Sequence, residues 1–208
     1  MKRWIIISML AFATSAFQTN ASDPDLVGAM AAMDGFARLA VEGELESVLG
    51  VVGFYGDPQP PVWLILTGVK DKPGVLRESV MSAGKVVAER KFKKASNQDL
   101  PDIPIKRGLM KVDSAAAFVI GEKTAKTQKV AFDSVHFQLR SRDLRNEPVW
   151  MLNLINRSQV SVGVVYVSAV SGEVLRTSWI ESPVQKFSSA PVEKKPGDTG
   201  TRMPRFVR

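Results

Sequence analysis

The chain of 208 residues contains no cysteine and only one histidine, His136. The absence of cysteine excludes disulfide bonds, thiol catalysis, cysteine metal sites and a lipid-modified cysteine, so the chain cannot be a lipoprotein. A single histidine excludes histidine-rich zinc and iron sites, and the sequence H-E-x-x-H is absent. The sequence therefore predicts neither a metal site nor a cofactor. Its stability must come from a hydrophobic core, and 45% hydrophobic residues suffice for one domain or two small ones.

Long apolar runs are also scarce. After the N-terminus, no segment reaches the roughly 18 apolar residues that a membrane-spanning helix needs. At the N-terminus, two basic residues precede an apolar stretch that ends at Phe17 and is too short to span a bilayer. This pattern is typical of a secretory signal over residues 1–21, with cleavage after Ala21 or after Ala16, and an uncleaved membrane anchor is the alternative. We expect a periplasmic or secreted protein with no transmembrane segment after cleavage.

Motifs for catalysis are incomplete. Ser82 and Lys85 match the serine–lysine spacing S-x-x-K, but they flank a predicted hairpin turn and not a helical turn. His136 lies close to Asp133 and Ser134, yet nothing nearby forms a nucleophile elbow or an oxyanion loop. We expect His136 to be exposed on the polar face of a strand. The sequence predicts no catalytic residue, and we expect a protein that is not an enzyme.

Two halves of the chain look alike. The tripeptide Pro-Val-Trp ends at Trp63 in the first half and at Trp150 in the second, and each begins an apolar run of strand composition. We expect both tryptophans in the core. One predicted strand precedes each run and two follow it. The strands other than the Pro-Val-Trp runs are expected at 47–54, 75–81 and 85–92, and at 130–140, 162–169 and 173–180.

Each set of predicted strands is preceded by a helical pattern. From Ser22 on, apolar residues from Leu26 to Leu39 recur every three or four positions, which is the spacing of one helical stripe. In the second half, Asp113 is a predicted N-cap for a shorter helix over 114–124, with Gly121 near its C-cap.

The sequence therefore predicts an α+β fold of two similar units, each a helix packed on a small antiparallel β-sheet. The first unit covers 22–92 and the second 113–181. A linker over 93–112 contains two prolines and mixed charge. From 182 to 208 the composition changes to Pro, Ser, Lys and Gly, which indicates a disordered basic tail.

The second half resembles the PepSY domains, small α+β units of protease propeptides and bacterial envelope proteins. The resemblance is carried by Ala115-Ala116-Ala117, Pro148-Val149-Trp150, Tyr166-Val167 and Gly172-Glu173-Val174-Leu175. The first half is similar in layout. The resemblance implies a role in inhibiting or chaperoning proteases or in envelope regulation, and it implies no catalytic residues.

Positive charge gathers at the ends of predicted strands. With 28 Lys and Arg against 21 Asp and Glu, the formal net charge is +7. The two clusters are Arg90, Lys91, Lys93 and Lys94, and Arg140, Arg142 and Arg145. Such charges either protect sheet edges from aggregation or form a surface for an anionic partner. For an exported chain, that partner is an envelope protein or an anionic polymer and not nucleic acid.

Together these patterns predict an exported, non-enzymatic binding or regulatory protein of the bacterial cell envelope, with protease modulation implied by the PepSY resemblance. Two alternatives remain open. One is a single cystatin-like domain that binds a small ligand in a cavity of its sheet, and the other is a hydrolase of unrecognised type. The sequence does not indicate an oligomeric state.

Overall fold

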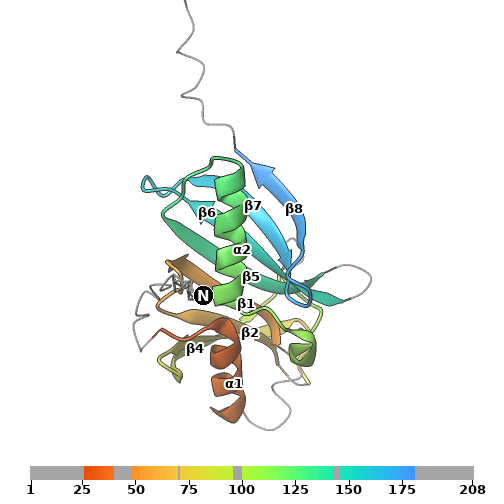
Figure 1. The fold of residues 1–208 in the computed structure, drawn as a ribbon. Coiled ribbons are helices and arrows are strands. Elements are labelled where there is room, and N and C mark those ends of the chain that lie inside the picture. Colours follow the sequence, from red (N-terminus) through yellow and green to blue (C-terminus); the bar gives the residue numbers. More distant parts are fainter. Residues whose placement is uncertain (1–25, 40–47, 70, 96–99, 143–145, 181–208) are drawn as a thin grey trace, which may run out of the picture.

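One antiparallel sheet of eight strands, with two helices on one of its faces, forms the body of the protein (Figure 1). The computed structural model describes residues 26–39, 48–69, 71–95, 100–142 and 146–180. The predicted signal, residues 1–21, and the predicted tail, 182–208, lie outside them. In chain order the elements are α1 (Ala29–Leu39), β1 (Val48–Gly56), β2 (Trp63–Gly68), β3 (Val75–Ser82), β4 (Lys85–Lys93), α2 (Ser114–Thr127), β5 (Ser134–Arg142), β6 (Glu147–Ile155), β7 (Ser161–Ser168) and β8 (Val174–Trp179).

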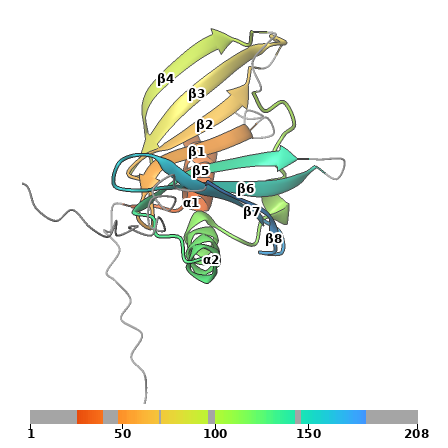
Figure 2. The same cartoon turned by 90° about the horizontal axis from the view of Figure 1, so that it is seen from above.

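The prediction of two units, each with its own small sheet, is wrong. The strand order is β4-β3-β2-β1-β5-β6-β7-β8, so the first strands of the two halves pair with each other (Figure 2). Val51 lies opposite Leu139, and Gly53 lies opposite Phe137. The physical reason is that two separate sheets would leave β1 and β5 as open edges with unpaired N–H and C=O groups. Pairing them satisfies both edges and makes one continuous sheet.

The predicted order of elements is confirmed, because a helix followed by four strands occurs in each half. Two details are corrected. β5 begins at Ser134 and not at 130, and α2 continues to Thr127, so Gly121 lies inside the helix and not at its end. A Cβ on Gly121 would lie 2.9 Å from Leu152 Cδ1, so glycine there allows α2 to approach β6 closely.

The core lies between the helices and the sheet and is shared by both halves. Trp63 and Trp150 are 1% and 0% exposed, which confirms that both are core residues. Phe137 on β5 touches both, with ring centroids 5.7 Å from Trp63 and 6.1 Å from Trp150. The two tryptophan rings are 6.4 Å apart. Residues from both halves therefore form a single aromatic cluster at the centre of the sheet.

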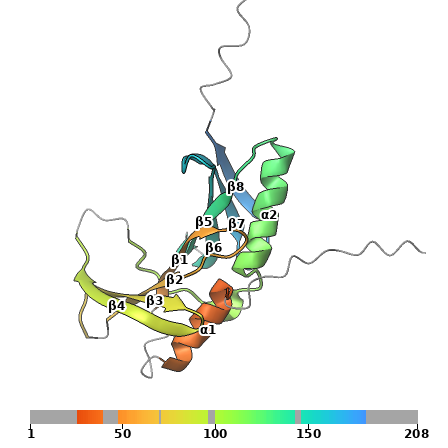
Figure 3. The ribbon, with the colours of Figure 1, turned by 90° about the vertical axis from the view of Figure 1, so that its left-hand side faces the viewer.

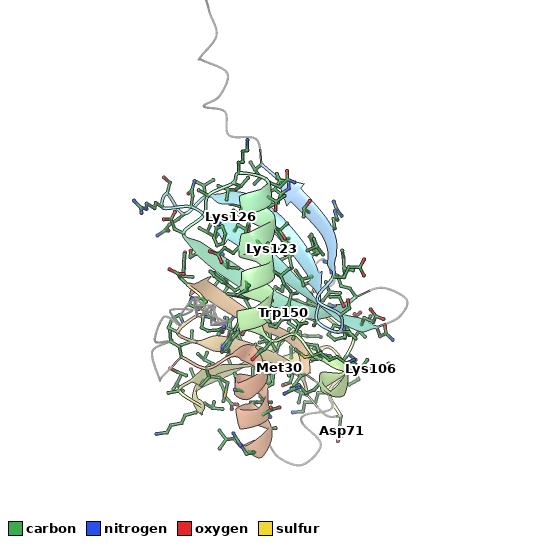
Figure 4. All side chains as sticks on the ribbon, viewed as in Figure 1. Met30, Asp71, Lys106, Lys123, Lys126 and Trp150 are labelled. Carbon is green, nitrogen blue, oxygen red and sulfur yellow. The ribbon has the colours of Figure 1, made fainter. Side chains whose placement is uncertain are left out.

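The two helices meet at their N-termini and run in opposite directions away from that point (Figure 1). Asp113 caps α2 as predicted, since its Oδ1 accepts from Ser114 N at 2.7 Å. The same oxygen accepts from Met30 N at 2.9 Å, and Ser114 Oγ accepts from Ala29 N at 3.0 Å. In Figure 4, Met30 is labelled at this end of α1.

The N-terminal cap of α1 therefore comes from the second half of the chain. The sequence places the start of this helix near Ser22, but Leu26 to Gly28 are not helical and α1 begins at Ala29. Ser22 itself lies outside the described residues. The buried side of α1 is formed by Ala29, Ala32, Met33 and Phe36, while Leu39 of the predicted stripe is exposed.

Candidate functional site

The face of the sheet opposite the helices, here called the open face, is crossed by a segment of the linker. Figure 3 shows both helices on one side of the sheet. Residues 100–106, here called the strap, follow β4 and lead back toward α2. The strap is held at both ends, because Leu100 O accepts from Lys94 Nζ at 3.1 Å and Ile105 N donates to Val48 O at 2.7 Å. Ser141 Oγ also donates to Pro104 O, at 2.9 Å.

A pocket of about 470 Å³ lies between the strap and strands β5 to β8, here called the arginine pocket. Its charged lining residues are Asp102, Arg140, Arg142 and Arg176. Three guanidinium groups against one carboxylate leave a net charge of +2 on the lining. An electropositive pocket of this size suits a small anionic group.

Tyr166 of β7 lines the arginine pocket and contacts two of its arginines. The guanidinium carbon of Arg142 lies 5.5 Å from the centroid of the Tyr166 ring, and that of Arg176 lies 5.9 Å from it. Contact with the aromatic ring restrains both cations without neutralising them. Within the part of the chain that the structure describes, neither Arg142 nor Arg176 forms an ion pair with a carboxylate. Their charge is therefore available to an incoming anion.

Arg140 stands at the boundary of the pocket. With the Gln138 amide turned so that its oxygen faces Arg140, that oxygen accepts from Arg140 Nη2 at 2.6 Å and from Nε at 2.9 Å. Arg140 also lines a second, smaller pocket of about 110 Å³ beneath the strap.

The structure does not bring the two predicted basic clusters together. β4 and β5 are separated by β3, β2 and β1, a distance of about 19 Å at the usual strand spacing. Arg140 and Arg142 both line the arginine pocket, whereas Arg145 lies outside the described residues.

The cluster on β4 is divided by the strand's alternation. Arg90 and Phe92 lie on the open face, while Lys91 and Lys93 lie on the other side of this edge strand. Arg90 pairs with Glu78 at 2.8 Å, and this hydrogen bond and the carboxylate charge raise the pKa of Arg90. Two of the four residues of this cluster therefore have partners within the protein, Arg90 on Glu78 and Lys94 on the strap.

Tyr166 and Arg176 line the pocket, but the sequence predicts a binding role for neither, and Tyr166 is named there only in the PepSY resemblance. Tyr166 faces Met151 across one strand pair and Arg176 across the next, so the three lie side by side on the open face. Alternation within a strand shows which residues share a face of that strand, but not which faces of different strands coincide. The pairing register of β5 to β8 shows that Tyr166, Arg176 and Arg142 lie on the same face of the sheet.

His136 lies at the other end of the open face of β5 and is not simply exposed, so the prediction for this residue is wrong. Its ring makes edge contacts with Phe54 and Tyr55, at centroid distances of 5.2 and 4.6 Å. A bulge in β1 between Gly53 and Gly56, with Tyr55 at a φ of 57°, turns both aromatic rings onto His136. The Nε2 atom is buried without a hydrogen-bond partner among the described residues, and burial lowers the pKa of His136.

This environment predicts a pH-dependent stability. Because the pKa of His136 is lower in the folded protein than its ordinary value of 6.5, the unfolded chain takes up a proton more readily. We expect the free energy of unfolding to fall as the pH drops below about 6.5, and to level off below the folded pKa. The free energy of unfolding, measured in urea at pH 7 and at pH 5, should differ less between the two pH values for His136→Gln than for the wild type. Equal differences would contradict the prediction.

Comparisons with known proteins identify no family. No protein-family model matches the sequence, and no curated protein matches it. Among solved structures, a candidate lipoprotein from Clostridium difficile 630 is similar with a TM-score of 0.43 and 13% identity. The similarity covers 64% of this chain and 81% of that one. At this level it assigns neither fold nor function, and the PepSY resemblance stays a prediction.

Two further findings concern the described residues alone. No helix among them is both long and apolar enough to span a bilayer. Within the same residues, no group of three or more His, Asp or Glu side chains could hold a metal ion.

Proposed function

We propose that this protein is an exported binding protein of the bacterial cell envelope that takes up an anionic partner through the arginine pocket. The pattern of residues 1–21 supports export, as argued from the sequence. The observation that carries the binding role is that the guanidinium groups of Arg142 and Arg176 both contact the Tyr166 ring.

This arrangement favours anion binding for two reasons. A guanidinium group offers several N–H donors in a plane, which match the oxygens of a carboxylate or phosphate. The aromatic ring holds both groups in place before the partner arrives, so less side-chain entropy is lost on binding. Arg142 and Arg176 also line the same pocket, so an anion in that pocket is attracted by both positive charges.

The histidine of the chain does not line the arginine pocket. His136, the one histidine of the chain, is six residues from Arg142 along β5, which is about 20 Å in a strand. It packs against aromatic rings instead of facing the arginine pocket. A histidine acting as general base must lie within hydrogen-bond reach of the reacting group. The protease-modulating role implied by the PepSY resemblance stays a separate prediction.

The test compares two double variants that remove the same charge. In Arg142→Ala/Arg176→Ala, the affinity for inorganic polyphosphate, measured by calorimetry at low salt, should fall at least about tenfold, equivalent to about 1.4 kcal/mol. In Lys91→Ala/Lys93→Ala, which removes two charges from β4, the affinity should change less than about twofold, as expected for screened distant charges. Raising the salt concentration should weaken wild-type binding.

Two results would overturn the proposal. Equal losses in both double variants would show that polyphosphate responds to total charge and not to the arginine pocket. Unchanged affinity in Arg142→Ala/Arg176→Ala would show that the pocket is not the binding site. Circular dichroism of both variants checks that the sheet remains intact.

A further inference from the structure

The second pocket beneath the strap extends the arginine pocket into an apolar space. This slot has a volume of about 110 Å³. Its apolar walls are Val52, Leu64, Leu66, Phe92, Leu100 and Pro101. The first four belong to the open face of β1, β2 and β4, and the last two are the strap that covers it. The slot and the arginine pocket share Leu100, Pro101 and Arg140, so they are adjacent compartments of one site.

The polar groups at the border of the slot are paired within the protein. Glu78 accepts from Arg90 at 2.8 and 2.9 Å. Gln138, turned as described above, accepts from Arg140. With these groups engaged, the inner surface of the slot offers mainly hydrocarbon, and a polar ligand group would lose its hydration there without compensation.

The slot is narrow because the strap lies close to the sheet. A Cβ on Gly50 would be 3.0 Å from Pro101 Cγ, so the glycine permits this approach. An engineered apolar cavity of about 150 Å³ admits benzene, and a somewhat smaller slot suits a short alkyl chain. The surface of a folded protein partner does not fit into a space of about 110 Å³.

We infer that the ligand is a small single-chain amphiphile, with its anionic head on Arg142 and Arg176 beside Tyr166 and its alkyl end in the slot beneath Leu100 and Pro101. This inference rests on the proposed function, because the head uses the same arginines. It goes further in naming the chemical class of the ligand. The head is a carboxylate or a phosphate, both of which match the guanidinium donors.

The test is a titration of the full chain with linear carboxylates of increasing length, from acetate to octanoate, followed by calorimetry. Each methylene that enters the slot should tighten binding about three- to fourfold, and the gain should stop once the slot is filled. Octyl phosphate, measured in parallel, distinguishes a phosphate head from a carboxylate head. Octanol, which has the tail without the charge, should bind more weakly than octanoate.

Two variants separate the head from the tail. Val52→Phe fills the slot, so it should remove the gain from chain length and leave polyphosphate binding unchanged. Arg142→Ala/Arg176→Ala should weaken all anionic ligands. If Val52→Phe does not fold, the chain-length series on the wild-type protein still decides the matter.

The outcomes distinguish this inference from the proposed function. If acetate and octanoate bind equally, or if Val52→Phe keeps the gain in affinity with chain length, the inference of an amphiphilic ligand is wrong. The proposed anion binding by the arginine pocket would be unaffected by that result. If polyphosphate binds and no carboxylate or alkyl phosphate does, the same conclusion follows. If neither polyphosphate nor any amphiphile binds, the proposed function fails as well.

Discussion

Replacing Trp150 by alanine lowers the free energy of unfolding by about 3–5 kcal/mol, as expected for removing a fully buried aromatic side chain. The ring contacts Phe137 of β5 and Trp63 of β2, so the cavity opens at the centre of the shared core. The variant also loses the hydrogen bond from Trp150 Nε1 to Val112 O, at 2.9 Å, which lies just before α2. Such a loss is a large part of the total stability of about 5–15 kcal/mol that is typical of folded proteins.

The same variant tests whether the two halves unfold together. Because β1 pairs with β5 and the aromatic cluster spans both halves, we expect one cooperative transition in urea, seen at the same midpoint by fluorescence and circular dichroism. The control is Trp179→Ala on the edge strand β8, which removes a half-buried ring. Its free energy of unfolding should fall by less than that of Trp150→Ala. Two separate transitions, or equal losses in the two variants, would contradict a shared core.

Replacing Asp113 by alanine lowers the free energy of unfolding by about 2–4 kcal/mol, because one carboxylate caps two helices. A lost N-cap costs about 1 kcal/mol for each helix. In addition, the positive ends of two helix dipoles face each other here, and each carries about half an elementary charge. Removing the carboxylate between them leaves both the Met30 and Ser114 N–H groups unpaired and the dipole repulsion uncompensated.

Two further variants separate the contributions at this position. Asp113→Asn keeps an oxygen acceptor and removes the charge. Its free energy of unfolding should therefore fall by about half as much as that of the alanine variant. Asp133→Ala removes a carboxylate that is 41% exposed and paired with the surface residue Arg157, and should cost no more than about 0.5 kcal/mol. Equal destabilisation by Asp113→Ala and Asp133→Ala in urea unfolding would contradict the shared cap.

The strands could be predicted from the sequence because their signals are local. In β5, the inward residues Val135, Phe137 and Leu139 alternate with polar ones, and this period of two is enough to place the strand. The sequence also predicts both tryptophans in the core, because large aromatic residues in strands are usually buried. Charge alone points to Arg140 and Arg142, and both line the arginine pocket.

The contacts between distant segments could not be predicted in this way. Asp113, which caps α1, lies 83 residues after Met30 in the chain, so the residues around Ser22 do not indicate it. The arginine pocket depends in the same way on register. Tyr166 and Arg176 meet Arg142 only because β6, β7 and β8 pair in the observed alignment.

Local patterns in the sequence are enough to predict the order of helices and strands, which residues are inward, and where positive charge gathers, because each depends on neighbours a few positions apart. Only the three-dimensional fold shows that β1 and β5 join two half-sheets into one, that Asp113 caps both helices, and that the strap covers an apolar slot beside the arginine pocket. Backbone pairing at a sheet edge requires only unpaired N–H and C=O groups, which every sequence provides. The side-chain pattern therefore does not predict which strand pairs with a given edge strand. That pairing depends on the free energy of the whole fold.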